Sequence, residues 1–137
     1  NLYLAGKNMP AYFYKLNSKT IKTIGFVESA KEFIQKHDVM VVPLLSGSGM
    51  RIKIIEAMAL GKCVISTKIG AEGINYSHSQ NIWIADSEQE FTEAITQFIS
   101  NPNLAKEIGK QARKLIEKEY SITSMEGKLT SFIHSID

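Results

Sequence analysis

The segment from Ser46 to Thr67, SGSGMRIKIIEAMALGKCVIST, constrains the fold of this chain more than any other. A glycine-rich loop leads into a mostly apolar run that predicts a helix, and Gly61 stands where a helix-ending glycine is expected. An apolar stretch typical of a strand follows directly. Loop, helix and strand in this order are the parts of an α/β unit built on a parallel sheet.

The predicted helix begins with two cations, Arg51 and Lys53. Helix N-termini favour acidic side chains, because the helix dipole is positive there. An anion bound between these cations and the free N–H groups of the first turn would remove the conflict. Glu56, one turn further on, could pair with Lys53 on the surface, or be partly buried and accept hydrogen bonds from sugar hydroxyls. The pattern therefore indicates a nucleotide site at the start of this helix.

Composition excludes several other classes of function. The chain has 137 residues, 44% of them hydrophobic, which suits one domain with a sizeable core. Its net charge of +2 is too small to indicate a nucleic-acid partner. A single cysteine and scattered histidines form neither a disulfide framework nor a metal-ligand pattern, so we expect no metal site and a reducing, cytoplasmic setting. The chain begins at Asn1 and enters an apolar run at once, and we interpret it as part of a longer protein.

Short apolar runs alternate with helical patterns along the chain. The expected strands are Leu2–Ala5, Lys22–Phe26, Val39–Pro43, Cys63–Thr67 and Asn81–Ile84. The expected helices are Pro10–Leu16, Ala30–Lys36, Arg51–Leu60, Glu88–Ser100, Leu104–Glu119 and 123–136. This alternation predicts a Rossmann-like parallel sheet of about five strands with helices on both faces. Val39–Val42 is apolar throughout and is expected to be buried on both faces.

Lys68–Gln80 is the one long stretch without a helical or strand pattern, and it follows a predicted strand. Loops at the carboxyl ends of strands form the ligand sites of open α/β sheets. The glycine pattern of this chain matches neither the dinucleotide fingerprint nor the phosphate loop of the NTPases.

Gly49–Thr67 and the following Gly70-Ala71-Glu72-Gly73 resemble the nucleotide-sugar-binding signature of retaining glycosyltransferases of family 4 (group 1), which have the two-domain GT-B fold. The likeness extends to residues 24–27, 38–43 and Tyr120–Ser121. It implies that residues 1–137 are the C-terminal, donor-binding domain of an enzyme of hexosyltransferase type. Most catalytic groups would then lie in an N-terminal domain outside this chain, and the chain alone would be inactive.

The resemblance assigns the donor-binding positions to Gly47, Ser48, Gly49, Met50, Arg51, Lys53 and Glu56, with Glu56 on the ribose, and base contacts to Gly25, Phe26 and Val27. The family pattern has another glutamate eight positions before Glu56, and Ser48 stands there in this chain. Arg51 and Lys53 replace the commoner glycine and proline and are similar to an Arg-x-Lys branch of the family. These departures leave the identity of the transferred sugar open.

The implied substrates are a UDP- or GDP-sugar donor, without any cofactor, and a sugar or lipid-linked acceptor held by the N-terminal domain. The resemblance also allows peripheral membrane association of the full-length protein. Two other interpretations stay open: a sugar-nucleotide epimerase of the same fold, and a non-catalytic flavodoxin-like binding domain. The apolar stripe of a terminal helix at 121–137 would pack either on the N-terminal domain or on the sheet of this domain.

Overall fold

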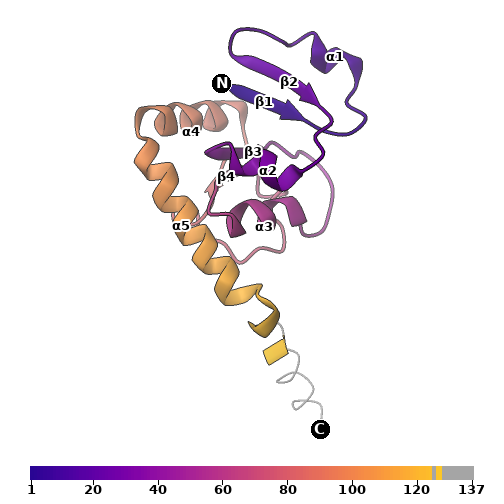
Figure 1. Cartoon of the computed structure of the whole chain (residues 1–137). Coiled ribbons are helices and arrows are strands. Elements are labelled where there is room, and N and C mark those ends of the chain that lie inside the picture. The colour runs from indigo at the N-terminus through magenta and orange to yellow at the C-terminus, as the bar shows by residue number, and fades with distance from the viewer. Residues whose placement is uncertain (125, 128–137) are drawn as a thin grey trace. The chain divides into compact units, whose positions relative to one another are not determined.

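The computed structural model describes residues 1–124, 126 and 127. Strands and helices alternate along these residues (Figure 1). They are β1 (Leu2–Ala5), α1 (Ala11–Tyr14), β2 (Ile21–Gly25), α2 (Ala30–Gln35), β3 (Val39–Val42), α3 (Ile52–Ala59), β4 (Cys63–Ser66), β5 (Trp83–Ile84), α4 (Glu88–Ser100) and α5 (Pro102–Glu119). The α/β class is confirmed. The predicted terminal helix lies mostly outside the described residues.

The chain divides into two compact units, Asn1–Phe33 and Ile34–Asp137. In the first unit β1 pairs with β2 in parallel, and α1 lies in the crossover between them. In the second unit three parallel strands pair in the order β3-β4-β5. The expected sheet of about five strands is therefore realised as two parallel sheets of two and three strands. Periodicity indicates where strands lie, but strand pairing depends on contacts between distant segments.

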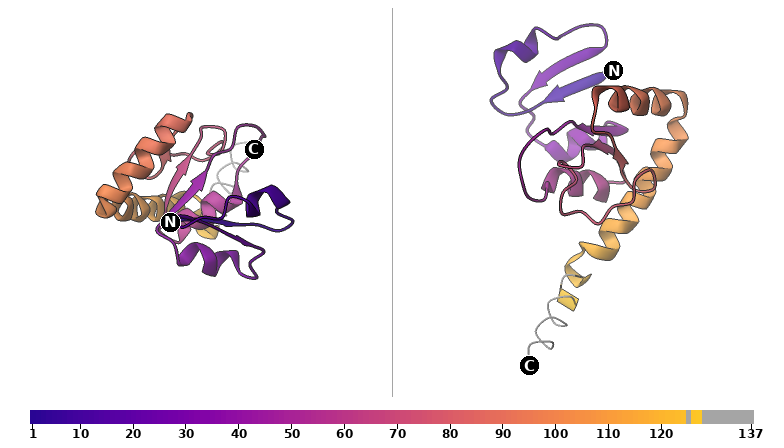
Figure 2. Two further views of the ribbon diagram at one scale, coloured as in Figure 1. Left: turned by 90° about the horizontal axis from the view of Figure 1, so that it is seen from above. Right: turned by 180° about the vertical axis from the view of Figure 1, so that it is seen from behind.

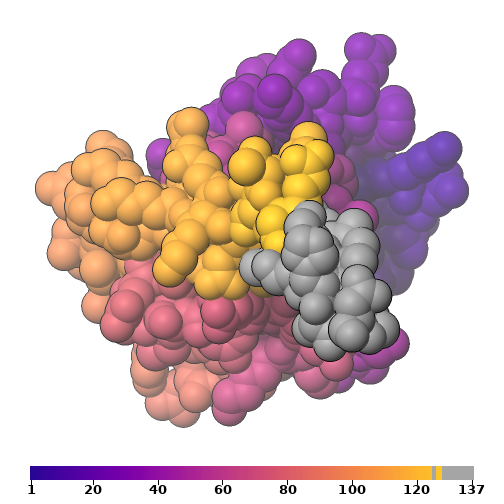
Figure 3. Space-filling view, turned by 90° about the horizontal axis from the view of Figure 1, so that it is seen from below, coloured from indigo at the N-terminus to yellow at the C-terminus, as the bar shows by residue number. Residues whose placement is uncertain are grey.

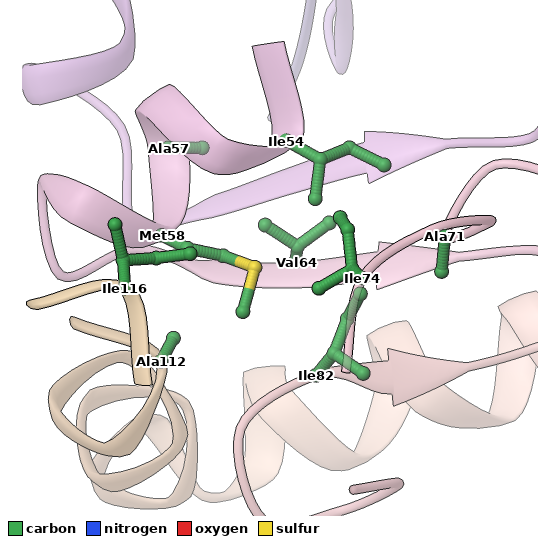
Figure 4. Packing of buried hydrophobic residues seen from close by; sticks show 9 residues of the cluster. All are labelled: Ile54, Ala57, Met58, Val64, Ala71, Ile74, Ile82, Ala112 and Ile116. Atoms are coloured by element: carbon green, nitrogen blue, oxygen red, sulfur yellow. The ribbon is translucent and has the colours of Figure 1, made fainter. Parts of the chain in front are cut away.

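The middle strand of the three-stranded sheet, β4, is buried along its whole length. Val64 belongs to one apolar cluster, while Cys63 and Ile65 belong to a second. The first cluster consists of Ile54, Ala57, Met58, Val64, Ala71, Ile74, Ile82, Ala112 and Ile116, whose side chains converge in Figure 4. The second consists of Cys63, Ile65, Ala85, Ala94, Phe98, Ala105 and Ile108. Successive residues of a strand point to opposite faces, so β4 carries helices on both faces of its sheet.

Val39–Val42 packs against the core on both faces, Met40 and Val42 against the first cluster and Val39 and Val41 against the second, but it is not fully buried. All four residues of β3 are only half-buried, because β3 is an edge strand of its sheet and β4 takes the central place. Both strands read as continuous apolar runs, so their composition alone did not distinguish the edge from the centre.

Helix ends follow the sequence signals closely. Ser87 and Glu90 form a capping box at the start of α4. At the end of α3, Gly61 has a φ of +71°, and its N–H donates to Met58 O at 2.9 Å. The next N–H, of Lys62, donates to Ala57 O at 3.0 Å. This pair of bonds is the Schellman motif, which lets the chain turn directly from α3 into β4.

The chain turns sharply at Asn101, between the end of α4 and the start of α5 (Figure 2). Helix α5 then runs along the second unit, as its orange and yellow residues show in Figure 3. Gly109 of α5 faces the turn between α3 and β4, and a Cβ built on it would overlap the carbonyl oxygen of Gly61. This approach brings Ala112 and Ile116 of α5 into the first cluster. None of the helices in the described part of the chain is long and apolar enough to cross a membrane.

We expect Gly109→Ala to destabilise the protein, because the new methyl group would collide with a backbone atom that cannot move aside cheaply. Overpacking of this kind costs about 1–3 kcal/mol, more than the roughly 1 kcal/mol by which alanine favours a helix over glycine. Urea unfolding measures the change. Lys106→Ala, on the exposed side of the same helix, is the matched control and should change stability by less than about 0.5 kcal/mol. A Gly109→Ala protein as stable as the native one would contradict the packing described.

We expect the Cys63 thiol to be inert in the folded protein. The side chain is fully buried, and burial raises the pKa of this thiol to about 12. Since the thiolate is the reactive form, labelling by a thiol reagent at pH 8 should follow global unfolding. Labelling in native buffer at a rate independent of added urea would contradict this expectation.

Candidate functional site

Two loops of the second unit meet at the end of its sheet where β3 and β4 have their carboxyl ends. One follows β3 and contains the glycine run; the other, 68–80, follows β4, the neighbouring parallel strand. Thr67 Oγ1 donates to Leu44 O at 2.6 Å, and the Gly49 N–H donates to Glu72 Oε2 at 2.8 Å. The glycine loop is therefore joined at two points to the segment that follows β4, at the carboxyl ends of the strands where α/β sheets bind ligands.

The glycine loop depends on its glycines. Gly47 and Gly49 have φ values of +120° and +84°, a region that side chains strongly disfavour. A Cβ on Gly47 would also overlap the guanidinium group of Arg51. Around Gly49, no atom comes within 4 Å of the place that a Cβ would occupy. The backbone of Gly49 is therefore open to a ligand on that side.

Arg51 folds back over the glycine loop. It is the residue that precedes α3, its backbone is extended, and its Nη1 donates to Ser48 O at 2.8 Å. The Nε of the same side chain is buried without a hydrogen-bond partner among the described residues. A buried donor without an acceptor is costly, so this guanidinium retains bonding capacity that the protein does not use.

Lys53 and Glu56 form an ion pair on the first turns of α3. Lys53 Nζ lies 2.6 Å from Glu56 Oε2, and the two side chains are 57% and 42% exposed. The surface pairing, one of the two arrangements left open by the sequence, is thus formed. An exposed pair of this kind contributes only about 0.2–1 kcal/mol, so a ligand could replace it at small cost.

A pocket of about 330 Å³ lies between the two loops. Its lining consists of Gly47, Lys68, Ile69, Ala71, Glu72, Gly73, Ile74 and Tyr76. Small-molecule sites span roughly 300–1,000 Å³, so this pocket is at the low end of that range. Of the predicted donor-binding residues only Gly47 lines it, while Met50 packs 3.5 Å from the position that a Cβ on Gly73 would take.

The 68–80 loop is fixed at its start by Asp86. Asp86 Oδ1 accepts from the Lys68 N–H at 2.9 Å, and Oδ2 lies 3.0 Å from Lys68 Nζ. The bond from the Lys68 backbone, followed by that from its ammonium group, lowers the pKa of Asp86, and the same pairing raises the pKa of Lys68. Both side chains are well exposed, so this contact orients the loop more than it stabilises the fold.

The end of α5 fixes the same loop further along. The Asn75 N–H donates to the Tyr120 hydroxyl at 3.0 Å, and that hydroxyl donates to Gly73 O at 3.2 Å. Asn75 Nδ2 donates to the Glu119 carboxylate at 3.0 Å. Ala71 and Ile74 anchor the loop in the core from the other side. Glu72 therefore stands on a segment whose neighbours are held on both sides.

The predicted base contacts lie at the end of β2 in the first unit: Gly25 is its last residue, and Phe26 and Val27 follow it. Gly25 has a φ of +77°, and the Tyr14 hydroxyl lies 2.6 Å from the position that a Cβ there would take. Phe26 is 65% exposed, and Val27 is half-buried. The exposed ring leaves Phe26 available to a ligand.

A second pocket, of about 460 Å³, lies between α5 and the segment before β5. It is lined by Gln80, Asn81, Gln111, Lys114, Leu115 and Lys118. None of the predicted site residues belongs to it, and most of its polar atoms come from exposed side chains. The smaller pocket is therefore the better candidate, because it adjoins the glycine loop.

Sequence reasoning missed two residues of this site, Glu72 and Tyr120, as individual contributors. Glu72 belongs to the Gly70–Gly73 segment of the family signature, which does not indicate a role for it, and Tyr120 lies more than forty positions from the loop it contacts. The loops that follow adjacent parallel strands lie at the same end of the sheet. This rule could have indicated that Glu72 lies near the glycine loop. No pattern in the sequence links Tyr120 to residues 73–75.

The family is decided by the sequence model of "Glycosyl transferases group 1", which matches residues 1–101. The chain belongs to this family. A curated relative, an "uncharacterized 44.6 kDa protein in cps region" of Klebsiella pneumoniae, is 33% identical over 82 residues. The matched region covers 60% of this chain and only 21% of that relative, so the chain spans about a fifth of its length.

Solved glycosyltransferase structures have the same fold, as the GT-B resemblance implied. HepE from Anabaena, in complex with UDP, is 19% identical with a TM-score of 0.73 over 84% of this chain and 32% of its own. Sucrose-phosphate synthase from Thermosynechococcus elongatus is 20% identical, with a TM-score of 0.74 over 99% and 39% of the two chains. The C-terminal domain of the group 1 glycosyl transferase LpcC from Francisella tularensis is 26% identical, with a TM-score of 0.67 over 77% and 56%.

We expect Tyr120→Phe to loosen the 68–80 loop while leaving the sheet intact. The variant keeps the ring but loses the hydrogen bonds of the hydroxyl group with Asn75 and Gly73, each worth about 0.5–1.5 kcal/mol. Hydrogen exchange should show faster exchange of the Asn75 amide than in the native protein, with the amides of β4 unchanged. Tyr12→Phe, on the exposed α1, is the control and should change neither. Equal exchange of Asn75 in native protein and variant would show that Tyr120 does not hold the loop.

Proposed function

We propose that this chain is the C-terminal donor-binding domain of a retaining, family 4 glycosyltransferase. The observation that carries the proposal is the start of α3, where a glycine loop with exposed backbone is followed by Arg51 and Lys53. The buried, unpartnered Nε of Arg51 supports an anionic ligand at this place. Membership of the group 1 family and the complexes of HepE with UDP and with UDP-glucose support a nucleotide sugar as that ligand.

The proposed chemistry assigns one task to each group. The backbone of Gly47, Ser48, Gly49 and Met50 lies along the donor, and the cations of Arg51 and Lys53 stabilise the diphosphate as it leaves the sugar. Glu56 exchanges its bond with Lys53 for bonds from the ribose hydroxyls. The base contacts of Gly25, Phe26 and Val27 stay a prediction. No metal and no cofactor is part of the proposal.

The full-length enzyme would bring its acceptor, a sugar or a lipid-linked group, and most catalytic groups from an N-terminal domain. We propose a cytoplasmic location with peripheral membrane contact, and a UDP- or GDP-sugar as donor. Residues 1–137 alone should then fail to transfer sugar, because correct positioning of two substrates can supply about 7–11 kcal/mol of the barrier. The epimerase and flavodoxin-like alternatives are not favoured by the family match or by the structural neighbours.

We expect Glu56→Gln to weaken nucleotide binding about fivefold without unfolding the protein. An amide still accepts hydrogen bonds, but bonds to an ionised carboxylate are roughly twice as strong. Calorimetric titration of the full-length protein with UDP and GDP measures the effect. The matched control is Glu107→Gln on α5, since Glu107 also pairs with a lysine three residues away, at 2.7 Å, outside the site. Binding of neither nucleotide at millimolar concentration would refute the proposed function, and equal affinity of Glu56→Gln and native protein would make Glu56 structural.

A further inference from the structure

We propose that the Glu72 carboxylate and the Gly49 N–H together bind a hydroxyl group of the transferred sugar. The inference rests on the proposed function and deepens it, because it concerns which part of the nucleotide sugar occupies the pocket between the two loops. Glu72 would then be a residue that determines donor specificity. It lies outside the positions that the sequence assigned to the donor.

The contact itself is the first argument. The Gly49 N–H donates to Glu72 Oε2 at 2.8 Å, although the residues are 23 positions apart. Both residues are exposed, and the space around the Cβ position of Gly49 holds no atom within 4 Å. A donor and an acceptor therefore stand side by side on a surface that a ligand can reach.

Charge decides which ligand group suits this pair. A phosphate oxygen that accepted from the Gly49 N–H would lie close to the ionised Glu72 carboxylate, and two negative charges at that distance repel each other. A hydroxyl group both donates and accepts. It can accept from the Gly49 N–H and donate to Glu72 without any repulsion. The pair therefore favours the neutral, hydroxyl-bearing part of a nucleotide sugar over its diphosphate.

The surroundings fit a sugar ring beside a diphosphate. Glu72 and Gly47 both line the pocket of about 330 Å³, whose other walls include the apolar side chains of Ile69 and Ile74. The guanidinium group of Arg51 lies against Gly47, at the place that a Cβ would occupy. It is the cation that the proposed function assigns to the diphosphate. The cationic group and the carboxylate thus adjoin opposite ends of the same short loop. A ligand with a charged and a neutral hydroxylated half matches this order.

The position of Glu72 is fixed by its own segment. The Ala71 N–H donates to Thr67 O at 3.0 Å, and Ala71 is fully buried. On the other side the Tyr120 hydroxyl donates to Gly73 O at 3.2 Å. A carboxylate held in place before the ligand arrives can discriminate between substrates, since little rearrangement is needed on binding.

The test compares each nucleotide with its sugar derivative. Native full-length protein, Glu72→Gln and Glu72→Ala are titrated with UDP, UDP-glucose, GDP and GDP-mannose at fixed pH and salt. The measured quantity is the ratio of the nucleotide Kd to the nucleotide-sugar Kd, for whichever pair binds. We expect a ratio above one in the native protein and a fall of about tenfold in Glu72→Ala, the loss expected for a hydrogen bond to a charged group. The affinity for the bare nucleotide should stay within about twofold of the native value, or increase as the repulsion is removed.

Glu107→Gln is the control and should leave every ratio unchanged. Three outcomes would overturn the inference: an unchanged ratio in both Glu72 variants, an equal loss for nucleotide and nucleotide sugar, or a native protein that binds neither sugar derivative more tightly than its nucleotide. An equal loss would show that Glu72 shapes the loop for the nucleotide. Failure to bind any nucleotide at all is a different result and would refute the proposed function.

Discussion

Burial of one strand, β4, is the constraint on which the rest of the second unit depends. Its residues are fully buried because alternate side chains enter two separate apolar clusters. Helix α3 contributes Ile54 and Met58 to the first cluster, and α5 contributes residues to both. Burial of apolar surface stabilises a fold by about 25 cal/mol for each Å² removed from water. Burial on both faces therefore fixes the position of β4 and of the strands β3 and β5 that pair with it.

The site follows from that placement. Because β3 and β4 are adjacent and parallel, the loops that leave them emerge at the same edge. There the polar groups satisfy one another: Arg51 bonds to Ser48, Lys53 to Glu56, and Gly49 to Glu72. Each bond is exposed and contributes little to folding, so a ligand could exchange these partners at small cost. The strands and buried residues fix the backbone of the site, whereas the bonds of its charged side chains can be exchanged for bonds to a ligand.

Much of this arrangement was predictable from the sequence because the signals are local. The Ser87 capping box, the glycine at the end of α3 and the positive φ of the glycine loop all involve residues within a few positions of one another. The motif around Arg51 indicated both the fold class and the family. The partner of Glu56 was left open, since pairing on a helix surface and a role in binding require the same residue types.

The sequence by itself determined the order of the strands and helices, the ends of most helices, and the glycine loop with two cations behind it. Tertiary structure alone decided that β4 and not β3 is the buried centre, that the strands form two sheets, and that Glu72 and Tyr120 reach the site. The reason is physical. Local signals act through backbone geometry over a few residues. Strand order and the contacts of Glu72 and Tyr120, in contrast, join segments more than twenty positions apart. Such contacts form only when the apolar faces of distant segments pack together.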